Sequence, residues 1–163
     1  MTFWLGDEEE DFSVAGWNHI NLELVPHLDD KVTTNLIWAN FTNEWDRVKN
    51  FDPSNNWHEY DIRWTPNHIT FIVDGVERRR EVHTEDDPHA GVQDLDKKQH
   101  IIMNFWTPKW CAEHLDSNAA ETMPWYTRYD YVKAYDWNGK NSETGEDEFE
   151  LRWEENFDGD QLN

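Results

Sequence analysis

The sequence has little of several features that would have assigned it to a class at once. It holds a single cysteine, Cys111, in 163 residues, so no disulfide forms within the chain and its redox compartment does not follow from cysteine pairing. No apolar run approaches the roughly 20 residues that a membrane-spanning helix needs. The start of the chain, which runs into the acidic stretch 7–11, has neither the basic beginning nor the long apolar centre of a signal peptide.

Basic residues are also scarce, with 14 Lys and Arg against 35 Asp and Glu and a formal net charge of -21. Such a charge argues against nucleic acid as a partner, because its phosphates need a basic surface, and against an anionic membrane surface. Aromatic residues are abundant by contrast, with 11 Trp, 8 Phe and 5 Tyr. Disordered chains are poor in aromatics, so we expect a folded domain with a sizeable core.

Alternation of polar and apolar residues is the main structural signal. In residues 17–24 the polar side chains His19, Asn21 and Glu23 alternate with apolar ones, which predicts a strand with one face on a core and one polar face. Similar alternation recurs along the chain, and Asp74-Gly75 is typical of a two-residue type I′ turn. No helical period stands out, so the predicted fold class is all-β, with two packed antiparallel sheets.

Three segments resemble signatures of glycoside hydrolase family 16. They are residues 57–75, which begin WHEYDIRWTPN, the segment MNFW at 103–106, and YDYVKAY at 129–135. The resemblance implies a curved antiparallel β-sandwich, a jelly roll of the concanavalin A-like kind. All-β domains of this size class run to roughly 200–250 residues, so we predict an incomplete sandwich whose open sheet edges bind a companion chain or self-associate.

The end of the chain resembles the strand with which most members of the family begin. Residues 149–159, FELRWEENFDG, follow the closing strand here, an order similar to that of circularly permuted licheninases, the β-1,3-1,4-glucanases of the Fibrobacter type. The predicted organisation is a sandwich portion at 1–137, a polar linker at the permutation joint at 138–148, and the family's usual first strand at 149–163. A surface loop tolerates such a joint.

The family's catalytic strand carries Glu-x-Asp-x-Glu, and the resemblance puts His19, Asn21 and Glu23 in the places of nucleophile, assisting Asp and acid/base. A retaining glycosidase needs two carboxyl groups about 5–5.5 Å apart, and His19 cannot form the glycosyl ester. As an alternative, His19 acts as a base that activates water in an inverting reaction. Asn21 does not ionise, so we expect the pKa of Glu23 to lie near its ordinary value. Without the resemblance, the row reads as a solvated polar face.

The resemblance also implies a set of residues that contact β-glucan. Flat aromatic faces suit the C–H faces of glucose rings, and Asn amides supply a donor and acceptors for hydroxyls. For Phe3 and Trp106 a place in the core is the alternative. The predicted substrate-binding residues are Phe3, Asn35, Asn104, Trp106 and Trp110.

Two functions follow from these residues, and a third stays open. The first is a β-glucan-binding relative of a β-1,3-1,4-glucanase with impaired catalysis, since Glu23 alone remains of the catalytic set. The second is an active hydrolase that uses Glu23 as acid/base with an altered nucleophile position. The third is a fragment or structural partner that needs a companion chain. An extracellular location is implied by the family resemblance.

Metal and charge clusters are weaker signals. None of the eight His residues forms a metal-ligand spacing, and no cofactor is expected to be required. Family members often hold a structural calcium, to which Asp130 or Asp158 would contribute oxygen ligands. The three arginines at 78–80 are flanked by glutamates, which predicts an exposed strand edge with salt bridges.

Overall fold

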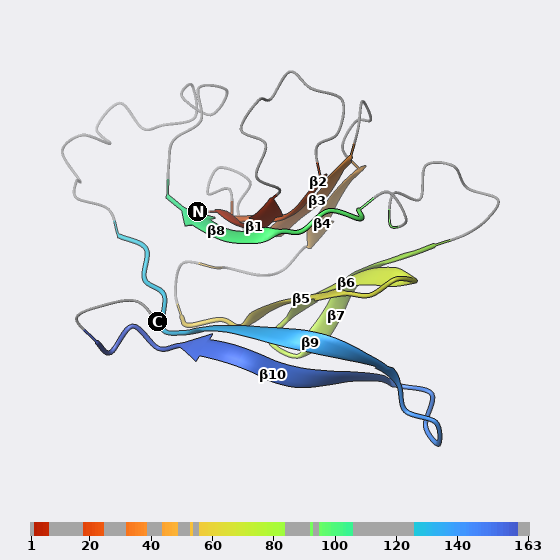
Figure 1. Cartoon of the computed structure of the whole chain (residues 1–163). Coiled ribbons are helices and arrows are strands. Elements are labelled where there is room, and N and C mark those ends of the chain that lie inside the picture. The colour runs from red at the N-terminus through yellow and green to blue at the C-terminus, as the bar shows by residue number, and fades with distance from the viewer. Residues whose placement is uncertain are drawn as a thin grey trace. The chain divides into compact units, whose positions relative to one another are not determined.

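The computed structural model describes residues 2–6, 18–24, 32–38, 44–48, 53, 56–83, 92, 95–105 and 126–159. This part of the chain is built from antiparallel strands and contains no helix (Figure 1), so the predicted all-β class is confirmed. The chain divides into two compact units, residues 1–121 and 122–163. The strands are β1 Thr2–Gly6, β2 Asn18–Leu24, β3 Val32–Trp38, β4 Glu44–Val48, β5 Tyr60–Trp64, β6 His68–Val73, β7 Val76–Val82, β8 His100–Asn104, β9 Val132–Lys140 and β10 Asp147–Glu155.

The first unit contains two sheets. The five-stranded sheet has the order β4-β3-β2-β1-β8, and the three-stranded sheet is the meander β5-β6-β7. Strand β2 lies at the centre of the five-stranded sheet, between β1 and β3. Strand β4 pairs with β3 although its residues are mainly polar. Its polar composition does not prevent pairing, because the ladder uses backbone groups and β4 is an edge strand.

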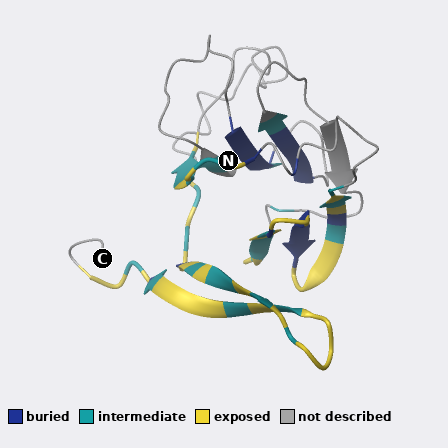
Figure 2. Cartoon of the chain, turned by 45° about the vertical axis from the view of Figure 1, so that its right-hand side comes forward, coloured by how far each residue is buried: buried dark blue, intermediate teal, exposed yellow. Residues whose placement is uncertain are grey.

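The apolar faces of the two sheets share one core. Ile20, Leu22 and Leu24 of β2 belong to the same buried cluster as Ile69 and Phe71 of β6. Ile20, Leu22 and Phe71 have no exposed surface, and Figure 2 shows β2 and β6 as buried strands. Alternation along β2 therefore faces its apolar side chains toward the core, as predicted.

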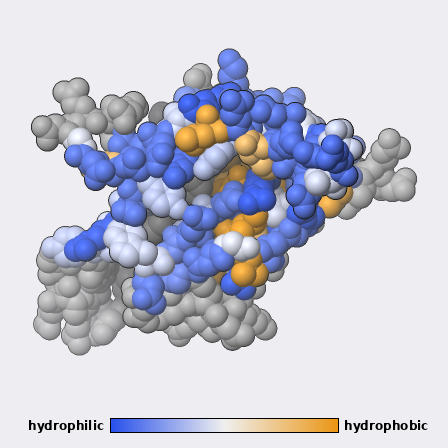
Figure 3. Space-filling view, turned by 90° about the horizontal axis from the view of Figure 1, so that it is seen from below, coloured by the Kyte–Doolittle hydropathy of each residue, from blue (hydrophilic) through white to orange (hydrophobic). Residues whose placement is uncertain are grey.

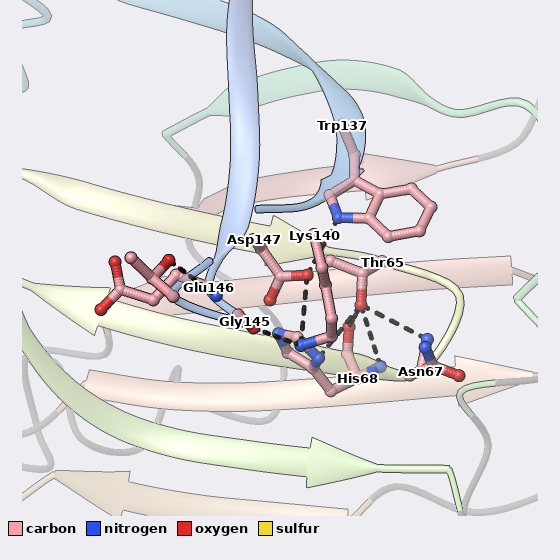
Figure 4. Close-up of polar contacts among 9 residues, drawn as sticks. Thr65, Asn67, His68, Trp137, Lys140, Gly145, Glu146 and Asp147 are labelled. Carbon is pink, nitrogen blue, oxygen red and sulfur yellow. Dashed lines mark hydrogen bonds and ion pairs between the residues drawn. The ribbon is translucent and has the colours of Figure 1, made fainter. Parts of the chain in front are cut away.

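Two turns of the meander follow from local sequence chemistry. Asp74 and Gly75 have φ values of 51° and 72°, and two positive φ angles are what a type I′ turn requires. At the preceding turn, the Thr65 hydroxyl oxygen accepts hydrogen bonds from the backbone N–H groups of Asn67, at 3.3 Å, and His68, at 3.1 Å (Figure 4). The turn at Asp74-Gly75 lies where the sequence predicted it.

The arginine run in β7 is only partly exposed. Arg80 pairs with Glu77 at 2.6 Å in an exposed ion pair, as predicted. Arg79 is 7% exposed, so the prediction of an exposed edge is wrong at that residue. A strand alternates its faces, and Arg79 falls on the face that carries the core.

The second unit is a two-stranded hairpin of β9 and β10. The sequence predicted a linker at 138–148, but β9 continues to Lys140 and β10 begins at Asp147. Side-chain hydrogen bonds support the end of this hairpin. Trp137 Nε1 donates to Asp147 Oδ1 at 3.0 Å (Figure 4). Within the turn, Asn141 Oδ1 accepts hydrogen bonds from the backbone N–H groups of Glu143 and Thr144. The segment between the strands is therefore a closed turn.

The face drawn in Figure 3 is mainly hydrophilic, with a few small hydrophobic patches. This agrees with the acidic composition of the chain. No helix among the described residues is long and apolar enough to cross a membrane.

Candidate functional site

The candidate site lies on the face of the five-stranded sheet that is turned away from the core. In β2, Ile20, Leu22 and Leu24 belong to the core cluster, so strand alternation places His19, Asn21 and Glu23 on the opposite face. His19 and Asn21 are buried, whereas Glu23 is half-buried. The described backbone thus forms the polar row that the sequence predicted for this strand.

Strand register extends this row across the sheet. Asn21 is paired with Asn35 of β3, and Glu23 is paired with Thr33. On the other side, Glu23 is paired with Thr2, which in turn is paired with Asn104 of β8. At about 4.8 Å per strand, the backbones of Glu23 and Asn104 are about 10 Å apart. We call this surface the polar face, and it consists of His19, Asn21, Glu23, Thr33, Asn35 and Asn104.

Thr33 is the member of the polar face that the sequence did not point to. It is fully buried and lies two residues before Asn35, hence on the same face of β3. A period of two counted back from Asn35 would have found it. The register with Glu23, which gives Thr33 its place beside the carboxyl group, does not follow from the sequence of β3 alone.

Four side-chain oxygens of the polar face have no hydrogen-bond partner among the described residues. All four atoms are buried, although Asn104 as a residue is half-buried. Most buried polar groups in proteins are hydrogen-bonded, and each exception calls for an explanation such as a catalytic role or a bound water or ion. The four atoms are Asn21 Oδ1, Thr33 Oγ1, Asn35 Oδ1 and Asn104 Oδ1.

Burial raises the pKa of Glu23 above its ordinary value, and a weak hydrogen bond from Asn21 Nδ2 to Glu23 Oε1, at 3.5 Å, only partly opposes this. We predicted a pKa near the ordinary value because Asn21 carries no charge. The structure corrects that prediction, because removing water from a carboxylate disfavours its charged form without any neighbouring charge. Glu23 is therefore suited to hold a proton at a higher pH than an exposed glutamate.

A second carboxylate is missing from the described register positions of this face. The predicted nucleophile position holds His19, whose Cα lies about 13 Å along the strand from that of Glu23 at ~3.3 Å per residue. The partners of His19 across the sheet are Gly6 and Ile37, and neither has a carboxyl group. The pair of carboxyl groups about 5–5.5 Å apart that a retaining glycosidase uses is thus absent from these positions.

Of the aromatic residues predicted to contact the substrate, only Phe3 lies among the described residues. In the backbone register, Phe3 is paired with Leu22 and with Met103. Trp4 is the position paired with Asn21. Trp106 and Trp110 lie outside the described residues. The roles of Phe3, Trp106 and Trp110 in substrate binding stay predictions.

No group of three or more His, Cys, Asp or Glu side chains among the described residues is arranged to hold a metal ion. Asp130 and Asp158, to which the resemblance assigned a structural calcium, are both exposed residues of the second unit. The calcium site stays a prediction.

Comparison with known proteins agrees with the resemblance in the sequence. The family model described as glycosyl hydrolases family 16 matches residues 1–133. Over 149 residues the chain is 27% identical to a beta-glucanase of Fibrobacter succinogenes, an alignment that covers 87% of this chain and 40% of that protein. It is 30% identical over 120 residues to a beta-glucanase of Acetivibrio thermocellus, covering 73% of this chain and 33% of that protein. The chain thus spans well under half the length of these curated relatives.

Proposed function

Because the chain belongs to glycosyl hydrolases family 16, we propose that its polar face binds β-glucan and that its capacity to hydrolyse this polysaccharide is impaired. The two relatives described above are beta-glucanases, which makes β-glucan the first ligand to test. Such a polymer is met outside cells, so the proposal includes an extracellular place of action.

The unpartnered oxygens of the polar face carry the proposal. Asn21, Thr33, Asn35 and Asn104 present four buried oxygens without partners among the described residues. Each is an acceptor, and a sugar hydroxyl is a donor that would satisfy it. The half-buried members Glu23 and Asn104 form the more accessible end of the face, from which a sugar ring would approach.

Impaired hydrolysis is proposed from the single carboxyl group. Glu23 can protonate a leaving oxygen, because burial raises its pKa, but no second carboxylate in a described position of the face is placed to form a glycosyl ester. The raised pKa is also the observation that favours the second candidate function, an active hydrolase with Glu23 as acid. In that reaction His19 would take a proton from water, and the product would have inverted configuration.

Lichenan is the probe that separates these functions. We expect the full chain to bind lichenan while releasing no reducing sugar, and Asn35→Ala to weaken binding about tenfold, the equivalent of one lost hydrogen bond. Asn138→Ala is the matched control, because Asn138 is an exposed asparagine of the second unit that bonds to Glu150. It should leave binding unchanged.

The outcomes are distinct. Release of reducing sugar that Glu23→Gln abolishes would support the active hydrolase and contradict impaired catalysis. Absence of both binding and turnover in folded protein would refute both candidates and favour a structural role with a companion chain.

The permuted strand order is part of the same proposal. Strand β9 contains most of the segment that resembles the closing strand of the family, and β10 contains most of the segment that resembles its usual beginning. The two pair as antiparallel neighbours, so the turn between them is a short connection at which the natural ends of an unpermuted relative would meet. This pairing supports the permutation joint predicted within residues 138–148.

A further inference from the structure

We propose that Arg79 is a positioning residue, which holds Thr33 and Asn35 in place for the ligand by fixing β3 from the opposite sheet. Arg79 lies on β7, and its Nη1 donates to the backbone oxygen of Thr34 at 3.0 Å and to Thr34 Oγ1 at 3.1 Å. Thr34 stands between Thr33 and Asn35 on β3. The inference rests on the proposed binding function only in what it says of the ligand.

The Arg79 side chain also contacts two residues of its own sheet. Its Nε donates to Glu81 Oε1 at 2.7 Å, and its guanidinium carbon lies 5.8 Å from the centre of the Phe71 ring. The side chain is 4% exposed. A buried guanidinium with a paired carboxylate and an aromatic neighbour is a rigid anchor, since breaking such a pair leaves an uncompensated charge.

The polar face needs an anchor of this kind. Thr33 Oγ1 and Asn35 Oδ1 have no hydrogen-bond partner among the described residues, so no described hydrogen bond fixes the position of these two atoms. Their direction is set by the backbone of β3. Because Thr34 is bonded through its carbonyl and its hydroxyl, a shift of β3 that would misdirect its two neighbours must also break contacts to Arg79.

The neighbouring arginine supplies a matched control. Arg80 lies on the other face of β7 and forms an exposed ion pair with Glu77. Arg80→Met removes the same charge as Arg79→Met and leaves the contacts to Thr34 intact. Arg79→Lys keeps the buried charge opposite Glu81, and serves as the second variant if Arg79→Met does not fold.

The test joins a measurement without ligand to one with lichenan. Amide hydrogen exchange should accelerate at Thr33, Thr34 and Asn35 in the Arg79 variants, by a larger factor than at β6, and should not change in Arg80→Met. Uniform acceleration across both sheets, or equal effects of the Arg79 and Arg80 variants, would overturn the proposal.

Lichenan binding then shows whether the anchor serves the ligand. Arg79→Lys should weaken binding about fivefold in the parent chain and less than twofold in an Asn35→Ala background, because positions that act through one another are not additive. A full fivefold loss in both backgrounds would overturn the action through Asn35. If the parent chain does not bind lichenan, the proposed function fails, while hydrogen exchange still decides whether Arg79 fixes β3.

Discussion

Adjacent threonines in β3 offer a direct test of the unpartnered oxygens. Thr33 and Thr34 are both fully buried, at 0% and 1% exposure. Thr34 Oγ1 accepts a hydrogen bond from Arg79, whereas Thr33 Oγ1 has no partner among the described residues. Valine has the shape of threonine without its hydroxyl. The two substitutions therefore differ in whether a hydrogen bond is lost.

The expected free-energy changes have opposite signs. A buried polar group without a partner costs about 1–3 kcal/mol, so Thr33→Val should stabilise the free protein by about 1 kcal/mol. Thr34→Val removes a hydrogen bond to a charged group and should destabilise it by about 1.5–3 kcal/mol. For a chain of this size, 1 kcal/mol corresponds to about 2–4 °C in the unfolding midpoint. Thermal unfolding followed by circular dichroism resolves both shifts.

Thr70 separates stability from binding. Its Oγ1 is also buried without a partner among the described residues, but it lies on β6 in the other sheet. Thr70→Val should stabilise the protein and leave lichenan binding unchanged, whereas Thr33→Val should stabilise it and weaken binding. If Thr33→Val destabilises the protein as much as Thr34→Val does, Thr33 has a partner of its own and the reasoning is refuted.

Three further predictions concern the site and the meander. The pKa of Glu23 is raised on folding, so the folded protein binds the proton more tightly than the unfolded chain does. The stability of the parent chain relative to Glu23→Gln should therefore fall as pH rises from about 4.5 through the raised pKa. Paired urea titrations at several pH values would contradict this if the difference in stability between the two proteins is constant. His19→Glu combined with Asn21→Asp should raise reducing-sugar release from lichenan at least about tenfold by restoring paired carboxylates, and no gain in folded protein would count against the assignment of the catalytic positions. Gly75→Ala should destabilise the protein by about 1–2 kcal/mol, because a φ of 72° is unfavourable for a residue with a Cβ. Nothing lies within 4 Å of the added methyl, so a clash is not the cause. Gly75→Asn should destabilise the protein less, and equal losses for the two variants would show that φ is not the cause.

Local chemistry explains what could be predicted from the sequence. The turn at Asp74 and Gly75 is encoded by two residues that tolerate positive φ, and the two faces of β2 are encoded by alternation alone. The family resemblance added Asn35 and Asn104, which the strand register places on the polar face together with Glu23. These features depend on neighbours in the chain or on a known pattern.

Contacts between distant segments explain what could not be predicted. A run of three arginines reads as exposed, whereas Arg79 is buried and donates a hydrogen bond to Thr34, which is 45 residues away in the sequence. The pKa of Glu23 depends on how deeply β2 is buried, which no motif encodes. The hairpin at 138–148 looked like a linker because its residues are polar, whereas its structure depends on pairing between β9 and β10.

The sheet edges leave one partner prediction open. In the five-stranded sheet, β4 and β8 are the edge strands among those described. Self-association or a companion chain at such an edge stays a prediction, which sedimentation of the chain at several concentrations would test.

The most direct measurement of the central claim is an NMR titration with a β-1,3-1,4-glucan oligosaccharide. The side-chain amide signals of Asn21, Asn35 and Asn104 should shift together with one saturation curve, because all three belong to the polar face, and the signal of Asn138 should stay in place. Shifts confined to other residues, or no shifts at all with a folded chain, would contradict the proposal that the polar face binds β-glucan.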